Sequence, residues 1–434
     1  KLSIFMILIL FLSGCSGNPF KDMEKGIDVY EETGVSIVNK GKYYDVVIDL
    51  DCGLSRMEIG RNYGIGILKV VPEYEALVDS YLQEYMRDDQ YEEYILRVQD
   101  IKPQIKEEYR EEIEGIASVF SGGNENVLGD GKISCDEVYM FNLLPDISNS
   151  VQCSVVAVFG ERSETGGTMI ARNLDWLNGK YNQASYFQSV ITYKQNNKMI
   201  CSIGYLGYIG IITGINNDGI FTAILVGSTG AQYNSINKYS YTIDLRYALE
   251  NCSGIYEIAD YMKDSSRNYV DHIIAIADSN SCIILENNTS GSRASNSQRP
   301  KREIREWDSV LRDNVTWGIS DAIASVNSFL LDGTYDNHTR GSLNKKRWEN
   351  LKKQLKSKGD KVTFEELKQV ISYDAGTPGT MSDSGDLYNK MTQQSIVFRP
   401  EDFYLEIYFH PKEQRDVPKN PTFEKVEIFN TTEK

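Results

Sequence analysis

One stretch of the chain, residues 151–176, constrains the fold more than any other. It reads VQCSVVAVFGERSETGGTMIARNLDW. Two short runs rich in β-branched and apolar residues are joined by a turn of Gly, Ser and Thr, which is typical of a β-hairpin. A hairpin brings the start of its first strand close to the end of its second strand. We therefore expect Cys153 to lie beside Arg172 and Asp175.

These three residue types suit a nucleophilic thiol. A nearby cation lowers the pKa of a thiol and favours the thiolate, which is the reactive form. If the bond between Gln152 and Cys153 were cut, the new α-amino group would titrate at about pH 7.7–8.0. Such an amine can act as the base for its own side chain, and Asp175 can orient it. The competing interpretation is a buried structural cysteine beside a surface ion pair.

The stretch resembles the nucleophile hairpin of the N-terminal-nucleophile (Ntn) hydrolases that cut linear amides. This group includes choloylglycine hydrolases, penicillin V acylases, acid ceramidase, N-acylethanolamine acid amidase and the acyl-CoA:6-aminopenicillanate acyltransferases. Its pattern is Cys followed by Ser or Thr, a hydrophobic strand and R-N-x-D, which stands here as CS at 153–154 and RNLD at 172–175. The resemblance implies an α+β fold, the four-layer αββα sandwich, from residue 45 to residue 410.

The same resemblance implies a mechanism. The thiol of Cys153 attacks the carbonyl carbon of Gln152, and water then releases Cys153 as a new N-terminus. The freed cysteine attacks a substrate amide, while Arg172 supports the thiolate and Asp175 orients the amine. The acyl-enzyme then reacts with water in an amidase or with an amine in an acyltransferase. We therefore expect an autoprocessed cysteine amidase for a small-molecule N-acyl amide, with an acyltransferase as the alternative.

Two further stretches resemble parts of this family. GINNDG at 214–219 is similar to the family pattern G-x-N-x-x-G, which implies substrate binding at Asn216. An oxyanion-site Asn of the choloylglycine hydrolases corresponds here to Val226, whose backbone N–H can still serve. The DNH at 336–338 resembles the T-N-H of the acyltransferase-like branch, which implies that Asn337 donates to the oxyanion. Arg347, which follows, can hold the catalytic cluster or a substrate carboxylate. Without the resemblance, Asn337 is a turn residue and Arg347 a helix-surface charge.

The first fifteen residues, KLSIFMILILFLSGC, combine a charged start, an apolar core and the ending LSGC. This pattern is typical of a secretory signal, and its ending resembles a bacterial lipoprotein cleavage box in which Cys15 is lipidated. A membrane-spanning anchor is disfavoured because about 20 apolar residues are needed to span a bilayer. We expect an extracytoplasmic protein that a lipid on Cys15 anchors to the cell membrane. The expected organisation is a signal at 1–15, a tether at 16–43, an N-terminal propeptide or α-subunit-like helical region at 44–152 and a catalytic region at 153–434.

Charge and cysteine spacing exclude other classes of function. The 46 Lys and Arg against 62 Asp and Glu give a net charge of −16, which argues against nucleic acid as a partner. The cysteines show no CxxC spacing, so neither a zinc site nor a redox motif is indicated. Residues 126–137 partly match a calcium loop, but Leu128 stands at a ligand position, and Ser134 with Glu137 fits a helix capping box instead. We therefore expect no metal and no cofactor.

Two other interpretations stay open. His338 could pair with Cys153 as in thiol proteases, without any processing of the chain. A non-catalytic envelope binding lipoprotein with this fold is the second. An intact bond between Gln152 and Cys153, together with an unreactive thiol, would favour the binding protein. The sequence does not name the substrate.

Overall fold

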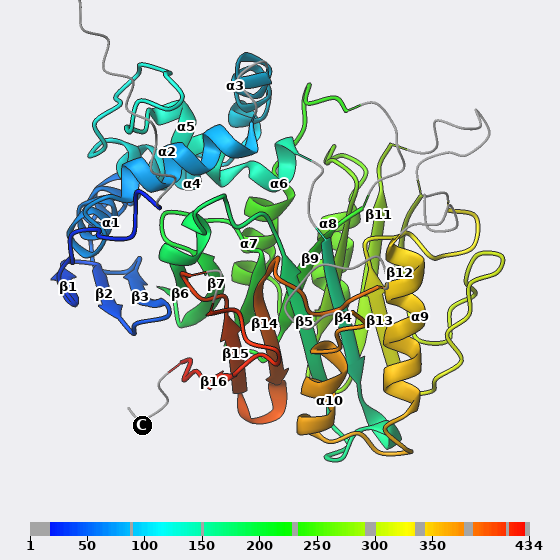
Figure 1. Ribbon diagram of the computed structural model, residues 1–434. Helices are drawn as coiled ribbons and strands as arrows, with labels where there is room; N and C mark the ends of the chain where they lie inside the picture. The colour runs from blue at the N-terminus through cyan, green and yellow to red at the C-terminus, as the bar shows by residue number, and fades with distance from the viewer. Residues whose placement is uncertain are drawn as a thin grey trace, which may run out of the picture.

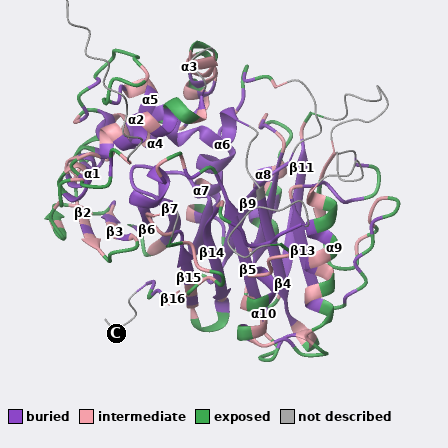
Figure 2. Ribbon diagram, viewed as in Figure 1, coloured by how far each residue is buried: buried purple, intermediate pink, exposed green. Residues whose placement is uncertain are grey.

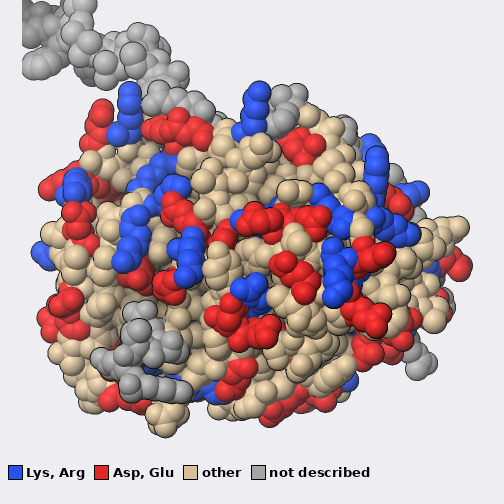
Figure 3. All heavy atoms as spheres, turned by 90° about the horizontal axis from the view of Figure 1, so that it is seen from below, with Lys and Arg blue, Asp and Glu red and all other residues tan. Residues whose placement is uncertain are grey.

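The computed structural model describes residues 18–86, 90–148, 152–227, 233–290, 301–334, 343–376, 385–413 and 416–429. These residues form two β-sheets that pack face to face, with helices on the outer side of each sheet (Figure 1). The face drawn in Figure 3 carries acidic and basic side chains interspersed with one another. Among the described helices, none combines the length and the apolar character that crossing a membrane requires.

The larger sheet has ten strands in the order β1-β2-β3-β6-β7-β8-β9-β10-β11-β12. Neighbouring strands are antiparallel, except that β3 and β6 run parallel. The strands are β1 (Val29–Glu32), β2 (Val35–Asn39), β3 (Tyr44–Asp49), β6 (Gln188–Gln195), β7 (Lys198–Tyr205), β8 (Thr213–Asn216), β9 (Phe221–Val226), β10 (His272–Ala277), β11 (Cys282–Asn288) and β12 (Lys301–Arg305). Strands β8 to β11 are buried along their whole length, because they are covered on both faces.

The smaller sheet has six antiparallel strands in the order β13-β4-β5-β14-β15-β16. Its strands are β4 (Gln152–Val158), β5 (Met169–Asp175), β13 (Ala322–Val326), β14 (Thr392–Arg399), β15 (Tyr404–Phe409) and β16 (Glu424–Lys425). Strands β4 and β5 form the predicted hairpin, with Cys153 opposite Leu174 and Val155 opposite Arg172. Because side chains alternate between the faces of a strand, Cys153 and Arg172 point to the same face.

Helices complete the sandwich on both sides. Helices α7 (Tyr241–Asn251) and α8 (Ile255–Lys263) pack on the ten-stranded sheet, and α9 (Leu343–Lys356) and α10 (Phe364–Ile371) pack on the six-stranded sheet. One apolar core lies between the sheets and includes Cys153, while the second lies under α9 and α10. Figure 2 shows the central strands of both sheets as mostly buried, whereas the edge strands β1, β12 and β16 are partly exposed. The order helix, sheet, sheet, helix confirms the predicted four-layer αββα sandwich.

A group of N-terminal helices covers one end of the ten-stranded sheet (Figure 1). The helices are α1 (Arg56–Val70), α2 (Tyr74–Tyr85), α3 (Tyr91–Ile101), α4 (Glu107–Ala117), α5 (Cys135–Asn142) and α6 (Leu144–Ile147), with short 3₁₀ turns η2 (Lys102–Gln104), η3 (Gly160–Arg162), η4 (Gln183–Tyr186) and η5 (Pro400–Asp402) elsewhere. Helices α1 and α4 pack backbone to backbone at Gly60. Because this residue has no side chain, it can approach the Glu112 carbonyl oxygen, with which a Cβ would clash. The capping box of Ser134 and Glu137 is confirmed at the start of α5.

The structure corrects one boundary. We predicted a tether over residues 16–43, but β1 and β2 lie within it and extend the ten-stranded sheet through β3. Alternation of apolar and polar residues in Val35–Asn39 provides the buried face of β2, with Val35 and Ile37 inside. The predicted helical region at 44–152 likewise starts with a strand, β3. The predicted signal at 1–15, including Cys15, lies outside the described residues.

Candidate active site

The hairpin brings the predicted thiol and arginine together. Cys153 is the second residue of β4 and is 1% exposed, and Arg172 on β5 is fully buried. Nη2 of Arg172 lies 3.6 Å from the Cys153 Sγ, and the same nitrogen donates to the Ile224 carbonyl oxygen at 2.9 Å. Ile224 belongs to β9 of the other sheet. Arg172 therefore reaches the thiol from the space between the two sheets.

Arg347 reaches the same cysteine from the opposite face of the sheet. It lies on α9, is 1% exposed, and donates from Nη2 to the Cys153 carbonyl oxygen and to Ser154 Oγ, the latter at 2.7 Å. Its Nη2 also lies 3.7 Å from Asp175 Oδ2, which is an ion pair without a hydrogen bond. These contacts place Arg347 at the backbone of Cys153, and its role in catalysis stays a prediction.

Asp175 ends β5 and lies opposite Gln152 in the hairpin. Its Oδ1 accepts a hydrogen bond of 2.6 Å from Thr392 Oγ1, whereas its Oδ2 has no hydrogen-bond partner among the described residues. Burial raises the pKa of Asp175 to about 6, although Arg347, Thr392 and Arg172 all act to lower it. The carboxyl group therefore changes charge close to neutral pH and keeps one oxygen free for a further donor.

The two arginines near Cys153 do not by themselves make its thiol ionise. Burial raises its pKa above the usual value, even though Arg172 and Arg347 act to lower it. A buried cysteine in this state is a neutral thiol at neutral pH, and it needs a base before it can attack a carbonyl. No histidine contact to Sγ is found among the described residues, and His338, the alternative base, lies outside them.

Sequence reasoning missed Asn327, which contacts the backbone of the cysteine directly. Its Oδ1 accepts a hydrogen bond of 2.5 Å from the Cys153 N–H, and its Nδ2 donates to the Val226 carbonyl oxygen at 2.9 Å. Val326, the last residue of β13, pairs with Ser154, so Asn327 follows at the level of Cys153. The sequence shows Asn327 as a polar residue directly after an apolar strand. Only the pairing of β13 with β4 shows that this residue lies beside Cys153.

A chain of hydrogen bonds fixes this asparagine. Asn344 Nδ2 donates to the Asn327 carbonyl oxygen at 2.9 Å. Nη1 of Arg347 donates to the side-chain oxygens of both asparagines at 3.2 Å. The backbone nitrogen of Cys153 therefore faces an acceptor whose position is set from α9 and from β9.

Three other predicted site residues have different outcomes. Asn337 lies outside the described residues, so its oxyanion role stays a prediction. Val226 is next to the site, since its carbonyl oxygen binds Asn327. Asn216 is a correction: its side chain binds the Leu249 carbonyl oxygen and the backbone N–H groups of Asp218 and Ile220. It stabilises the turn before β9, about 17 Å along that strand from the Val226 end, so a substrate contact there is not supported.

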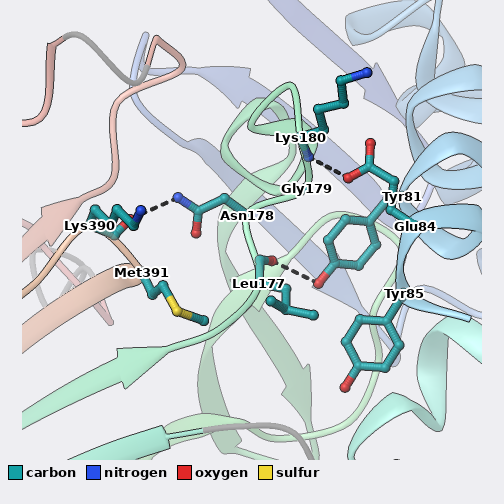
Figure 4. Close-up of a pocket in the computed structure, with 9 residues that line it drawn as sticks. All are labelled: Tyr81, Glu84, Tyr85, Leu177, Asn178, Gly179, Lys180, Lys390 and Met391. Atoms are coloured by element: carbon teal, nitrogen blue, oxygen red, sulfur yellow. Dashed lines mark hydrogen bonds between the residues drawn. The ribbon is translucent and has the colours of Figure 1, made fainter. Parts of the chain in front are cut away.

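An open pocket of about 290 Å³ adjoins the cluster (Figure 4). Its walls include Leu177, two residues after Asp175, and Met391, which precedes Thr392. Tyr81 and Tyr85 of α2 form the opposite wall, and the lining is completed by Glu84, Asn178, Gly179, Lys180 and Lys390. Helix α2 of the N-terminal region therefore forms one wall of a pocket whose other wall includes sequence neighbours of Asp175 and Thr392.

The family assignment follows from the sequence. Residues 162–404, more than half of the 434 residues, match the family described as "Acyl-coenzyme A:6-aminopenicillanic acid acyl-transferase". The matched segment contains Arg172, Asp175 and Arg347. It starts after Cys153 and so does not include the thiol. Among curated proteins, none is similar enough to the sequence to count as a match.

The chain is also similar to solved structures at low sequence identity. The Caenorhabditis elegans ortholog of N-acylethanolamine-hydrolyzing acid amidase is 13% identical with a TM-score of 0.41, covering 63% of this chain and 100% of its own. A mutant conjugated bile acid hydrolase from Clostridium perfringens is 14% identical with a TM-score of 0.34, covering 64% and 98%. Penicillin V acylase from Agrobacterium tumefaciens is 12% identical with a TM-score of 0.37, covering 65% and 87%.

The family assignment rests on the sequence match and on the four-layer topology. Both agree with the resemblance seen in the nucleophile hairpin. The chain therefore belongs to the acyl-coenzyme A:6-aminopenicillanic acid acyl-transferase family of Ntn hydrolases, enzymes that hydrolyse amides or transfer acyl groups.

Proposed function

We propose that this chain is a self-processing cysteine amidase that hydrolyses a small N-acyl amide through an acyl-enzyme on Cys153. The observation that carries the proposal is the contact between the Cys153 backbone nitrogen and Asn327 Oδ1 beside a buried, neutral thiol. Any buried backbone N–H needs an acceptor, but a structural cysteine does not need a buried arginine on each face of its strand. An N-terminal nucleophile also needs a group that holds its amine while its thiol reacts, and Asn327 Oδ1 can do this.

Processing is the first step. Sγ of Cys153 attacks the carbonyl carbon of Gln152, the amide nitrogen of Cys153 takes up a proton and leaves, and a thioester forms. Water then hydrolyses the thioester, which yields a carboxylate on Gln152 and a free thiol on Cys153. Asn327 Oδ1, which accepts from the amide N–H before cleavage, is placed to accept from the α-amino group afterwards.

Turnover uses the new α-amino group as the base. It takes the thiol proton as Sγ attacks the substrate carbonyl, and it returns that proton to the departing amine. Asp175 Oδ2, which has no hydrogen-bond partner among the described residues, is within the cluster that can orient the amine. Arg172 supports the developing thiolate, since its Nη2 already lies at the sulfur. Asn337 remains our proposed oxyanion donor, together with the backbone N–H of Val226.

Acyl transfer is the second candidate function, because the family match is to an acyl-transferase. The acyl-enzyme would be the same, and an amine rather than water would accept the acyl group. Adding an amine acceptor to the reaction separates the two. In an amidase, the share of acyl groups that the amine accepts rises only in proportion to the amine concentration. A transferase forms the new amide in preference to the free acid.

We further propose the location that the N-terminal sequence predicts. Residues 1–15 act as a lipoprotein signal, and a lipid on Cys15 holds the enzyme at the outer side of the cell membrane. The substrate is then an extracytoplasmic small molecule, and nucleic acid is not a partner. Release of the protein from membranes after Cys15→Ala, with wild-type protein retained, would support this location.

Intact mass and N-terminal sequencing of the purified chain test the catalytic proposal. We expect two fragments, the second beginning Cys-Ser-Val-Val, and we expect Cys153→Ala to remain one chain without amidase activity. Cys201→Ala is the matched control, since Cys201 is also a fully buried free cysteine, on β7. It should process normally. A wild-type chain that stays intact would overturn the processing step, and an active Cys153→Ala would overturn the nucleophile.

A further inference from the structure

The segment of residues 385–392, which leads into β14, contacts both partners of the ion pair between Arg347 and Asp175. At its end, Thr392 Oγ1 donates to Asp175 Oδ1 at 2.6 Å. The same Oγ1 accepts a hydrogen bond of 3.0 Å from the Asn389 N–H. Because a hydroxyl group has one proton, a Thr392 hydroxyl that accepts from Asn389 is oriented to donate to the carboxylate. The end of the segment therefore fixes one oxygen of Asp175.

The start of the segment lies on the backbone of α9. Gly385 is buried and has a φ of +92°, a conformation that glycine adopts without strain. A Cβ here would lie 2.6 Å from the Lys346 Cβ and 2.9 Å from the Arg347 backbone nitrogen, well inside the usual contact distance. Asn350 Nδ2 also donates to the Gly385 carbonyl oxygen at 2.9 Å. The segment therefore approaches the backbone of Arg347 as closely as only glycine allows.

The middle of the segment is fastened to the fold. The N–H groups of Leu387 and Tyr388 donate to the Tyr373 carbonyl oxygen at 2.9 and 3.0 Å. The Leu387 carbonyl oxygen accepts a hydrogen bond of 2.6 Å from Asn173 Nδ2. Asn173 is fully buried on β5, two residues before Asp175. The segment is thus tied both to β5 and to the chain just beyond α10, so its two ends have defined positions.

These contacts bear on the distance between the two charges. Arg347 Nη2 lies 3.7 Å from Asp175 Oδ2, which is too far for a hydrogen bond. Thr392 holds Oδ1, while Gly385 determines how near the backbone of α9 comes to the segment. Asp175 Oδ2 consequently has the positive charge of Arg347 close by and no hydrogen-bond partner among the described residues.

Resting on the function proposed above, we propose that Gly385 is a positioning residue that sets the distance between Arg347 and Asp175. It acts through the backbone of α9 and touches neither the thiol nor the ion pair itself. A side chain at position 385 forces α9 and the segment apart. Either Arg347 then recedes from Asp175, or Thr392 does.

Both movements change the pKa of Asp175 in the same direction. Three side chains act to lower this pKa, and they are Arg347 on α9, Thr392 on β14 and Arg172 on β5. Asp386, which belongs to the segment, raises it, but its Oδ1 is held by the Ala375 N–H at 2.7 Å. We therefore expect the loss of a lowering contact to dominate, so that the pKa of Asp175 rises when Gly385 is replaced.

The test compares Gly385→Ala with Gly359→Ala. Gly359 also has a positive φ, +76°, but no atom lies within 4 Å of a Cβ there. Both variants carry the strain of a positive φ, and only Gly385→Ala meets α9. The pKa of Asp175 is measured by ¹³C NMR on aspartate-labelled Cys153→Ala protein, with Asp175→Asn identifying the signal. We expect a rise of about 0.5–1 unit in Gly385→Ala and no change in Gly359→Ala.

Kinetics on the self-processed enzyme provide the second readout. With an N-acyl p-nitroanilide as substrate, kcat/KM of Gly385→Ala should fall about 10–100-fold, the scale expected when catalytic groups are displaced by a fraction of an ångström to an ångström. The acid limb of its pH profile should move to higher pH. Gly359→Ala should keep the wild-type kcat/KM and the wild-type limb.

Each outcome is decisive. An unchanged pKa of Asp175 in a folded Gly385→Ala, or an equal change in Gly359→Ala, overturns the role of Gly385 and leaves the proposed function intact. If Gly385→Ala does not fold, Asn350→Ala tests the same contact, because it removes the hydrogen bond to the Gly385 carbonyl oxygen. It should raise the pKa by a smaller amount, and no rise overturns the proposal. A wild-type chain that neither self-processes nor hydrolyses any anilide overturns the proposed function instead, while the NMR measurement still decides on Gly385.

Discussion

Arg246 and Arg172 are both fully buried, but their charged surroundings are opposite. Arg246 on α7 donates to Glu112 from two nitrogens, at 2.7 and 3.1 Å, and to Glu250 from Nε at 2.9 Å. Arg56 also binds Glu112, so two arginines meet two carboxylates. Burial alone would lower the pKa of Arg246, but the two glutamates raise it well above its ordinary value. This cluster is electrostatically complete and joins α1, α4 and α7.

The cluster around Cys153 is incomplete. Among the ion pairs of the described residues, Arg347 has one carboxylate partner, Asp175, and Arg172 has none. Arg172 Nε and Nη1, Arg347 Nε and Asp175 Oδ2 have no hydrogen-bond partner in the described part of the chain. Burial lowers the pKa of both arginines below the ordinary value. A site with surplus buried positive charge is prepared for a negative charge that arises only during reaction, on the thiolate or the oxyanion.

The largest expected effect is on the complete cluster. Arg246→Met leaves Glu112 and Glu250 in a buried region without their main partner, so we expect the free energy of unfolding to fall by about 3–5 kcal/mol. Chemical denaturation followed by circular dichroism measures this. Specific activity of the folded fraction should remain within about twofold, because the cluster does not contact the thiol. If the free energy of unfolding fell by less than about 1 kcal/mol, the cluster around Arg246 would not be the stabilising one of the two.

Arg172→Met, the same substitution at the incomplete cluster, should have the reverse profile. We expect kcat/KM to fall about 10²–10³-fold, as when one preorganised donor is removed from a reacting charge. The free energy of unfolding should change by no more than about 1 kcal/mol, because removing an incompletely paired buried charge removes its desolvation penalty as well. Steady-state kinetics and denaturation on one preparation measure both quantities. A destabilisation equal to that of Arg246→Met would show that Arg172 is structural.

The smallest effect is on pH dependence. Because Asp175 must be ionised to hold the α-amine and its pKa is about 6, we expect activity to fall as the pH drops through about 6. An unperturbed carboxyl group would place this loss near pH 4. Thr392→Val removes a hydrogen bond that lowers this pKa, so the acid limb should move to higher pH, by at most about one unit.

Thr213→Val is the control for the pH experiment. Thr213 is also a fully buried threonine, on β8, and its hydroxyl has no partner among the described residues. The acid limb of kcat/KM should therefore stay at its wild-type position. A shift of equal size in both variants would mean that Asp175 does not produce the limb.

The sequence alone was sufficient to predict which residues meet within the β4–β5 hairpin. Cys153 and Arg172 share one face of the β4–β5 hairpin, and its register brings Asp175 to the same end of the hairpin on the other face. The resemblance to the Ntn hydrolases supplied the αββα layers, since motif and fold occur together in that family. Asn216 was assigned by its motif, yet its side-chain oxygen binds two N–H groups of its own turn and its side-chain nitrogen binds the Leu249 carbonyl oxygen. A motif gives the residue type at a position but not its distance from the reacting atom.

Only the tertiary structure identified Asn327 and Thr392, and only it showed what Arg347, already named from the sequence, contacts. Asn327, Arg347 and Thr392 reach the cysteine and the aspartate across sequence separations of 174, 194 and 217 residues. Each position depends on how β13 and β14 pair beside the hairpin and how α9 packs on it. Strand order and helix packing result from the burial of whole apolar faces, a non-local balance that no short pattern records. The thiol and its carboxylate are therefore local features of this sequence, while the groups that hold them are properties of the fold.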